Sequence, residues 1–190
     1  AARGFAHRPE LTIESFGDES RAYLLDNDFI PDDLRASWMS IVDQALQAVR
    51  RAYADRTVAT LRLHGDCHGG NVLWTDEGPH FVDFDDARSG PAIQDLWMLL
   101  SGDRRAMEAQ LRILIDAYET FRAFDRRELA LIEPLRTLRL LHYSAWLARR
   151  FEDPAFPIAF PWFNTQRYWQ DRVLELREQV ALMDEPPLEL

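Results

Sequence analysis

The fold of this 190-residue sequence is decided by His64-Gly65-Asp66-Cys67-His68-Gly69-Gly70-Asn71, followed by Phe81-Val82-Asp83-Phe84-Asp85. An aspartate lies five positions before an asparagine, and a strand-like apolar run then ends at a second aspartate. Carboxylate and amide oxygens suit two tasks, because a carboxylate accepts protons and both types bind hard divalent cations. The pattern indicates a catalytic loop that is followed by a metal-binding strand end.

The spacing of these residues is that of a kinase catalytic loop. Protein kinases carry H-R-D-L-x-x-x-N followed by D-F-G. Here Gly65 stands in place of the arginine, and Asp83-Phe84-Asp85 stands in place of D-F-G. In phosphoryl transfer one carboxylate accepts the proton of the attacking hydroxyl, while an amide oxygen and a second carboxylate hold Mg²⁺ on the ATP phosphates. The alternative to a kinase loop is a polar turn in which these residues have this spacing by chance.

The basic residues are unusual, because all 22 of them are arginine and the sequence contains no lysine. A kinase normally grips the ATP phosphates with a strand lysine beneath a glycine-rich loop. The eight glycines nowhere form G-x-G-x-x-G or a P-loop. We therefore expect the C-terminal part of a longer kinase, without the N-terminal nucleotide-clamping lobe. On its own this part is expected to be inactive.

Composition narrows the class of protein. A net charge of −10 disfavours a general nucleic-acid or anionic-membrane binder. The single cysteine, Cys67, excludes an intrachain disulfide, and one cysteine beside His68 is too little for a zinc site. The sequence has no apolar run of 18 residues and no signal-peptide pattern, so we expect no membrane span and a cytoplasmic location. The oligomeric state is left open.

The sequence is expected to form a single domain over residues 1–190, mainly α-helical with a small β-hairpin. Residues 1–20 are interpreted as an irregular leading segment, 57–90 as the catalytic loop and metal-binding hairpin, and 91–183 as a helical subdomain. Apolar residues recur at intervals of three and four between Pro31 and Tyr53, which predicts an amphipathic helix. Residues 57–63 read as a strand. Residues 71–74 and 80–84 read as two strands of a hairpin joined by a turn-prone stretch.

The remainder is predicted to be helical. Residues 92–100 are nearly all apolar and read as a buried helix, and Asp103 is a candidate N-cap for a helix whose apolar stripe runs through 107–121. Asp125 and Glu128 resemble a capping box that opens a helix to about residue 150, with Pro134 expected to bend it. Residues 153–162 read as an ordered loop and 165–182 as a final helix.

The complete motif resembles known phosphotransferases. H-G-D-x-H-x-x-N, with Gly65 after His64, is similar to the aminoglycoside phosphotransferase and choline kinase superfamily more than to ordinary protein kinases. From about Phe5 to the end, the sequence resembles the stress response kinase A family. The segments that carry this resemblance are residues 63–74, 81–88, 90–100, 132–136, 153–157 and 185–188. The turn around residues 76–78 is one residue longer than the family pattern suggests, which a hairpin tolerates.

The resemblance implies the C-terminal lobe of a protein-kinase-like fold. It also implies a cytoplasmic, ATP- and Mg²⁺-dependent kinase that phosphorylates serine or threonine of protein substrates in a stress response. Carried over to this sequence, Asp66 is the catalytic proton acceptor, and Asn71 and Asp83 are the metal ligands.

Other polar residues are expected to support this site. His64 is interpreted as holding the loop by hydrogen bonds. Asp95 lies among apolar neighbours, so its charge must be paired or hydrogen-bonded, and we expect it to accept backbone N–H groups of the catalytic loop. Asp85 either orients the loop or contacts metal, or it is a surface residue. Trp162 and Trp169 are expected to fill the core, with a substrate platform as the alternative.

Two other functions compete with a Ser/Thr protein kinase. The same chemistry serves a small-molecule kinase that acts on an aminoglycoside, choline or homoserine hydroxyl. A non-catalytic remnant that acts as an interaction module belongs to a different class. A lysine strand and a glycine-rich loop in the preceding sequence would favour the enzyme over the remnant.

Overall fold

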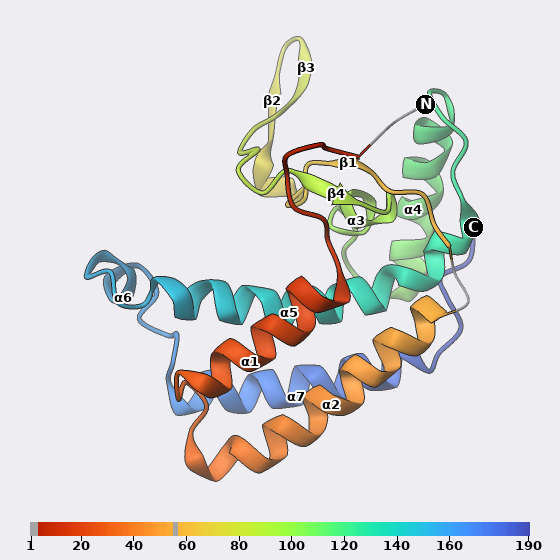
Figure 1. The fold of residues 1–190 in the computed structure, drawn as a ribbon. Coiled ribbons are helices and arrows are strands. Elements are labelled where there is room, and N and C mark those ends of the chain that lie inside the picture. Colours follow the sequence, from red (N-terminus) through yellow and green to blue (C-terminus); the bar gives the residue numbers. More distant parts are fainter. Residues whose placement is uncertain (1–3, 55–56) are drawn as a thin grey trace. The chain divides into compact units, whose positions relative to one another are not determined.

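The computed structural model describes residues 4–54 and 57–190, and it is mainly helical with small antiparallel sheets (Figure 1). This confirms the predicted fold class. The chain divides into two compact units. The site unit comprises Ala1–Leu11, Arg56–Ile132 and Pro186–Leu190, and the helical unit comprises Thr12–Asp55 and Glu133–Glu185. A single domain over the whole chain stays a prediction. No helix within the described residues is long and apolar enough to cross a membrane.

The helical unit is built on long amphipathic helices. Its elements are η1 (Glu14–Asp18), α1 (Glu19–Asp26), α2 (Asp32–Ala54), α5 (Ile132–Arg150), α6 (Ala155–Ala159) and α7 (Gln166–Met183). Helix α2 confirms the predicted apolar stripe, whose buried members are Trp38, Ile41, Val42, Ala45, Leu46, Ala48 and Val49. It packs along α7, where the rings of Trp38 and Trp169 meet edge to face with centroids 6.4 Å apart. Trp169 is fully buried, which confirms it as a core residue.

The interpretation of residues 1–20 as irregular is wrong from Glu14 onward, because η1 and α1 begin there. Thr12 and Ser15 start this helical run, since the backbone N–H of Ser15 donates to Thr12 Oγ1 at 3.0 Å. Gly17 lies within η1. In the structure it is buried, and a Cβ there would lie 2.5 Å from Leu46 Cδ2, so glycine permits close approach to α2.

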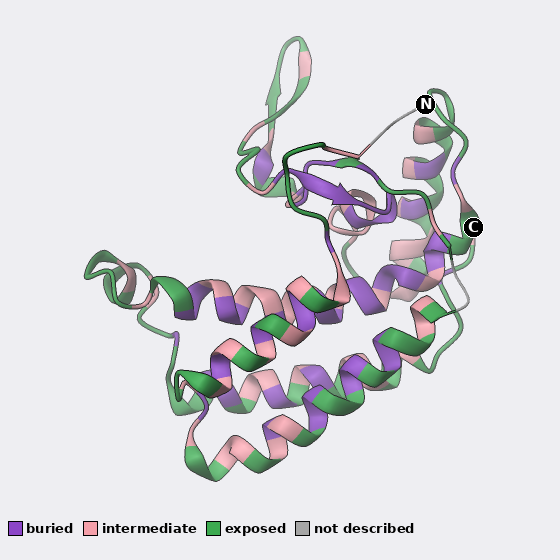
Figure 2. Ribbon diagram, in the orientation of Figure 1, coloured by how far each residue is buried: buried purple, intermediate pink, exposed green. Residues whose placement is uncertain are grey.

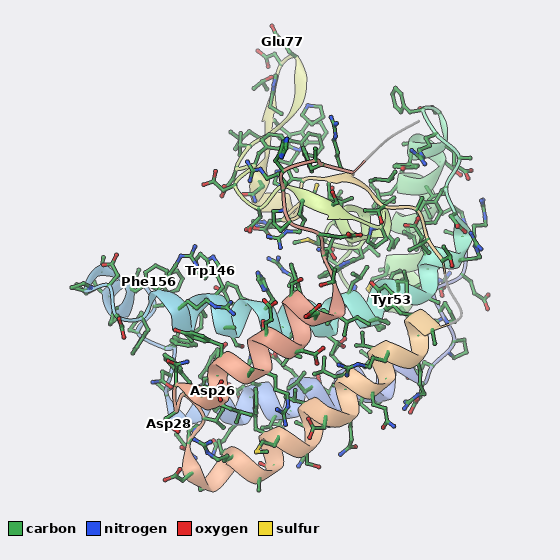
Figure 3. The ribbon with its side chains drawn as sticks, viewed as in Figure 1. Asp26, Asp28, Tyr53, Glu77, Trp146 and Phe156 are labelled. Carbon is green, nitrogen blue, oxygen red and sulfur yellow. The ribbon has the colours of Figure 1, made fainter. Side chains whose placement is uncertain are left out.

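The aromatic residues at 153–162 surround a short helix rather than a loop alone. Helix α6 occupies Ala155–Ala159, and the rings of Phe156 and Trp146 are 5.5 Å apart (Figure 3). Trp162 is half-exposed, with its ring 5.7 Å from that of Tyr168. Tyr168 itself is buried and shares a 2.7 Å hydrogen bond with Ser144, and burial raises the pKa of its hydroxyl to about 12.

The site unit is assembled from short elements. They are β1 (Leu61–Leu63), η2 (Gly69–Asn71), β2 (Val72–Thr75), β3 (Gly78–Phe81), β4 (Arg88–Gly90), α3 (Ile93–Trp97), α4 (Arg104–Glu119) and η3 (Arg126–Leu131). Strands β2 and β3 form the predicted hairpin, which projects from the unit with Glu77 at its tip (Figures 1 and 3). Gly78 closes the turn with φ of +114°, a conformation that side chains disfavour. Strand β1 pairs with β4, which the sequence analysis did not predict.

The remaining helices differ from their predicted bounds. The apolar stretch 92–100 contains only the short α3, and the stretch from Asp125 to Leu131 forms η3 before α5 begins. Pro134 therefore lies in the first turn of α5, where proline is tolerated, and no bend is needed. The expected N-cap at Asp103 is confirmed, and the structure adds one at the start of α7, which the sequence analysis did not predict. Asp103 Oδ1 accepts the N–H of Ala106 at 2.9 Å, and Thr165 Oγ1 accepts the N–H of Tyr168.

Candidate active site

Asp66 follows strand β1 and lies in a loop that its neighbours fix through backbone groups. Asn71 Nδ2 donates to the carbonyl oxygen of Asp66 at 3.0 Å, so the fold brings these two residues together. Asn71 is buried, and the side chain of Asp66 is only 20% exposed. The polar spacing read from the sequence thus corresponds to one folded loop.

His68 also lies beside Asp66. The N–H of Gly70 donates to His68 Nδ1 at 3.0 Å, which leaves the proton of the neutral ring on Nε2. That nitrogen is 3.5 Å from Asp66 Oδ2. Cys67 is buried, and burial raises the pKa of its thiol to about 11, so it stays protonated. The described residues contain no cluster of three or more His, Cys, Asp or Glu that could hold a metal ion.

His64 links the catalytic loop to the segment that carries Asp83. Its Nδ1 accepts the N–H of Asp66 at 3.4 Å, and its Nε2 lies 2.8 Å from the carbonyl oxygen of Val82. These contacts define a ring that is protonated on Nε2 and donates to Val82. The expected structural role of His64 is confirmed.

Asp95 holds the backbone of the same loop. Its Oδ2 accepts the N–H of His64 at 2.7 Å, and its Oδ1 accepts the N–H of Gly65 at 2.9 Å. Burial raises the pKa of Asp95, while the two backbone hydrogen bonds act in the opposite direction. The predicted brace between Asp95 and the loop is confirmed.

Gly65 occupies a place that no other residue fits. Its φ is +87°, and a Cβ would collide with the carbonyl oxygen of Asp86. That carbonyl also accepts a hydrogen bond from Nε of the buried Arg88 at 2.8 Å, and Arg88 Nη2 is 2.6 Å from Asp86 Oδ1. The glycine after His64 is therefore required by the close approach of the segment that follows Asp83.

Asn71 and Asp83 lie at the two legs of the hairpin base. The N–H of Val82, next to Asp83, donates to the carbonyl oxygen of Asn71 at 3.1 Å. Asp83 is exposed and has φ of +63°, a left-handed conformation that costs a non-glycine residue energy and that clusters at functional sites. One amide and one carboxylate provide oxygen ligands for Mg²⁺, which usually takes one or two carboxylates and completes its shell with water and phosphate. The donor set fits that ion.

Asp85 and the hairpin face solvent. Asp85 is exposed, and its backbone carbonyl accepts a hydrogen bond from Arg8 Nη1 at 2.8 Å. In Figure 2 the strands β1 and β4 are buried, whereas most of the hairpin is exposed. The loop that carries Asp66 thus follows a mostly buried sheet, and the predicted metal ligands Asn71 and Asp83 lie at the base of an exposed hairpin.

Sequence reasoning missed three residues that hold this site together. Arg88 fixes Asp86 against Gly65, as described above. Gln94 is buried, and its Nε2 lies 3.4 Å from the carbonyl oxygen of Gly65. Glu128, predicted as half of a local capping box, instead accepts the N–H of Ile93 at 2.9 Å. Of these three, only Gln94 stands within a largely apolar stretch, and that signal does not identify a distant partner.

An apolar cavity of about 490 Å³ lies behind the loop within the site unit. Its walls include Leu63, His64, Phe84, Leu96 and Tyr118. The rings of His64 and Phe84 are 4.7 Å apart, so the aromatic residue between the two aspartates of Asp83-Phe84-Asp85 packs on the catalytic loop.

The chain is similar in sequence to known phosphotransferases and kinases. Residues 1–132 match the phosphotransferase enzyme family. The chain is 48% identical to stress response kinase A of Escherichia coli K12 over 98% of its own length and 56% of that protein. It is 50% identical to serine/threonine protein kinase RdoA of Salmonella typhimurium LT2 over 99% of its length and 57% of that protein. The chain thus spans about half the length of the curated relatives that it matches.

Solved structures share the fold. A choline/ethanolamine kinase family protein from Mesorhizobium loti aligns with a TM-score of 0.62 at 20% identity, over 94% of this chain and 55% of that one. Amicoumacin kinase hAmiN, solved with AMP-PNP, Ca²⁺ and Ami, aligns with a TM-score of 0.57 at 16% identity, over 95% of this chain and 52% of that one. At these identities the likeness establishes the fold alone.

The first prediction concerns Gly65. We expect Gly65→Ala to lower the free energy of unfolding by more than the roughly 1–2 kcal/mol of a left-handed alanine, because the new methyl group also collides with Asp86. Gly69→Ala is the matched control in the same loop, since a Cβ there meets no atom within 4 Å. Urea denaturation of both variants measures the difference, and equal stability would contradict the packing described for Gly65.

The second prediction concerns Asp95 and pH. Because its folded pKa lies above the ordinary value of 3.8, the folded state holds the proton more tightly than the unfolded state does. The stability that Asp95 contributes is therefore complete below pH 3.8 and decreases as pH rises through the folded pKa. We expect the free energy of unfolding of the wild type, minus that of Asp95→Asn, to fall over this range. Urea titrations at a series of pH values test this, and a rising difference would contradict it.

Proposed function

Because the chain belongs to the phosphotransferase enzyme family, we propose that the complete protein transfers the γ-phosphoryl group of ATP to serine or threonine hydroxyls of protein substrates. Similarity of 48–50% to a stress response kinase and to a protein named a serine/threonine kinase supports this acceptor class. The same names support a role in a stress response. We place the reaction in the cytoplasm, where ATP and Mg²⁺ are available.

The observation that carries the proposal is the fixed position of Asp66. Asn71 holds its carbonyl oxygen, His64 accepts its N–H, and Asp95 fixes the two residues before it. Such a carboxylate accepts the proton of the substrate hydroxyl while the hydroxyl oxygen bonds to the γ-phosphorus and the bond to the β-phosphate oxygen breaks. Phosphoryl transfer depends mainly on positioned charge, which a rigid loop supplies.

Asn71 and Asp83 are the residues that would hold Mg²⁺. A Mg²⁺ ion held by these two residues would supply positive charge that neutralises charge on the phosphate groups. Asn71 is buried and its amide nitrogen is already bound to Asp66, which leaves the amide oxygen for a ligand role. The grip on the ATP phosphates that lysine normally supplies has no counterpart in this sequence, so this chain alone is proposed to be inactive.

The fold also serves small-molecule kinases, which keeps a second acceptor class open. One structural neighbour is named a spectinomycin phosphotransferase in complex with ADP and spectinomycin, and it aligns with a TM-score of 0.51 at 16% identity. An aminoglycoside, choline or homoserine hydroxyl would use the same proton acceptor and metal. The higher identity to protein kinases favours the protein acceptor. A non-catalytic module is disfavoured, because hydrogen bonds converge on the backbone around Asp66.

The third prediction tests the proton acceptor in the complete protein. We expect Asp66→Ala to lower turnover by about 10²–10⁴-fold while the fold persists, because a positioned general base is removed. Asp76→Ala, in the exposed hairpin turn, is the matched control and retains activity. Transfer of labelled phosphate from ATP to a protein acceptor, with phosphoserine and phosphothreonine identified after hydrolysis, is the measurement. Near-normal transfer by Asp66→Ala would refute the assignment, and transfer only to small alcohols would favour the second acceptor class.

The fourth prediction separates the metal ligand from the base. Asp83→Asn should raise the Mg²⁺ concentration needed for half-maximal activity, because a charged ligand of a hard cation becomes neutral. Asp76→Asn should leave that concentration unchanged. Mg²⁺ titrations of initial rate at fixed ATP decide the matter, and superimposable curves for Asp83→Asn and the wild type would remove Asp83 from the metal site.

A further inference from the structure

Glu128 is a buried carboxylate whose partner lies far away in the sequence. It belongs to η3 and is 2% exposed. Its Oε2 accepts the backbone N–H of Ile93, 35 residues earlier, at 2.9 Å. Burying a charged group is costly unless hydrogen bonds compensate, so this contact accounts for how the carboxylate is tolerated. An apolar side chain would fill the same space at a lower cost in free energy.

The contact falls at the first residue of α3. Helix α3 begins at Ile93, and the preceding Ala92 has no side chain that caps it. The initial N–H groups of a helix have no intrahelical partner and attract a negative charge. Glu128 therefore supplies, from η3, the cap that the sequence around α3 lacks. Burial raises the pKa of Glu128, and hydrogen bonding from the backbone at Ile93 and Ala92 opposes that rise.

Helix α3 in turn carries the residue that fixes the catalytic loop. Asp95 lies two residues after Ile93, and its carboxylate accepts the N–H groups of His64 and Gly65. Gln94, between them, approaches the carbonyl oxygen of Gly65. The helix has only five residues, so no long helical ladder holds its position. The position of the first turn of α3 therefore determines whether the side chains of Gln94 and Asp95 reach the loop.

We propose that Glu128 is a positioning residue for phosphoryl transfer, acting on Asp66 through the capped start of α3 and Asp95. This inference rests on the proposed function. The path consists of consecutive hydrogen bonds: Glu128 to Ile93, then Asp95 to His64 and Gly65, directly before Asp66. Loss of the cap lets α3 shift and moves the proton acceptor relative to the substrate hydroxyl. Misplacement by about 1 Å lowers turnover by about 10²-fold in enzymes generally.

The experiment compares variants of the complete protein. Glu128→Ala is expected to lower kcat by about 10–100-fold without changing KM for ATP, because nucleotide contacts are left intact. Glu128→Gln keeps one acceptor oxygen but loses the negative charge, so it is expected to lower kcat by a smaller factor than Glu128→Ala does. Asp125→Asn is the matched control in the same segment, because its carboxylate binds the exposed Arg127. It is expected to leave kcat unchanged.

A double-mutant cycle distinguishes positioning from a general loss of stability. If Glu128 acts through Asp95, Glu128→Gln lowers kcat in the wild-type background but has no further effect in Asp95→Asn. Hydrogen exchange at the amides of His64 and Gly65 is expected to rise in Glu128→Gln more than at Leu63. Additive effects on kcat, or a uniform rise in exchange across the site unit, would overturn the proposal.

The outcomes also separate this inference from the proposed function. An active Asp66→Ala variant refutes the function whatever Glu128 does. An inactive Asp66→Ala variant combined with additive Glu128 and Asp95 effects leaves the function standing and refutes the path. If Glu128→Ala does not fold, the cycle with Glu128→Gln, an isosteric change, still decides the question.

Discussion

The site depends on one carboxylate, that of Asp95, which accepts two consecutive backbone N–H groups from the loop ahead of Asp66. Unpaired backbone donors are costly once buried, so these two bonds fix the path of the chain between β1 and η2. The contacts of the residues around Asp66 depend on that path of the chain. Gly65 can adopt φ of +87°, the carbonyl of Asp86 can approach it, and His64 can reach both the N–H of Asp66 and the carbonyl of Val82.

The two units are stabilised in different ways. The helical unit relies on apolar stripes of long helices, such as the contact between Trp38 and Trp169. The site unit has strands of three or four residues, and two-stranded sheets of that size are marginal by themselves. Buried polar side chains compensate in the site unit, where Arg88 binds Asp86 and Glu128 caps α3. Its geometry is therefore set by directional bonds, which suits a site that must position oxygen atoms.

The sequence predicted the features that depend on neighbours along the chain. Periodicity identified α2, turn residues identified the hairpin, and Asp103 identified the start of α4. Asp95 was also predicted, because a charge beside Leu96 and Trp97 has to find polar partners, and the loop offered them.

Features that depend on distant partners were missed or misread. A strand was predicted over residues 57–63, of which Leu61–Leu63 form β1, but its pairing with the distant β4 was not predicted. Glu128 matched a local capping pattern, yet it bonds a residue 35 positions away. Residues 1–20 read as irregular in the sequence, although they contain η1, where Gly17 allows close approach to Leu46. Asn71 and Asp83 differ in burial and in the contacts that hold them. Asn71 is buried, and its side-chain hydrogen bond to Asp66 lies within the site unit. Asp83 is exposed, has a left-handed backbone conformation, and lies at the base of a hairpin whose Trp74 is 77% exposed. Hydrogen bonds within this unit thus fix the positions of Asp66 and Asn71, whereas Asp83 lies on the exposed side of the hairpin base.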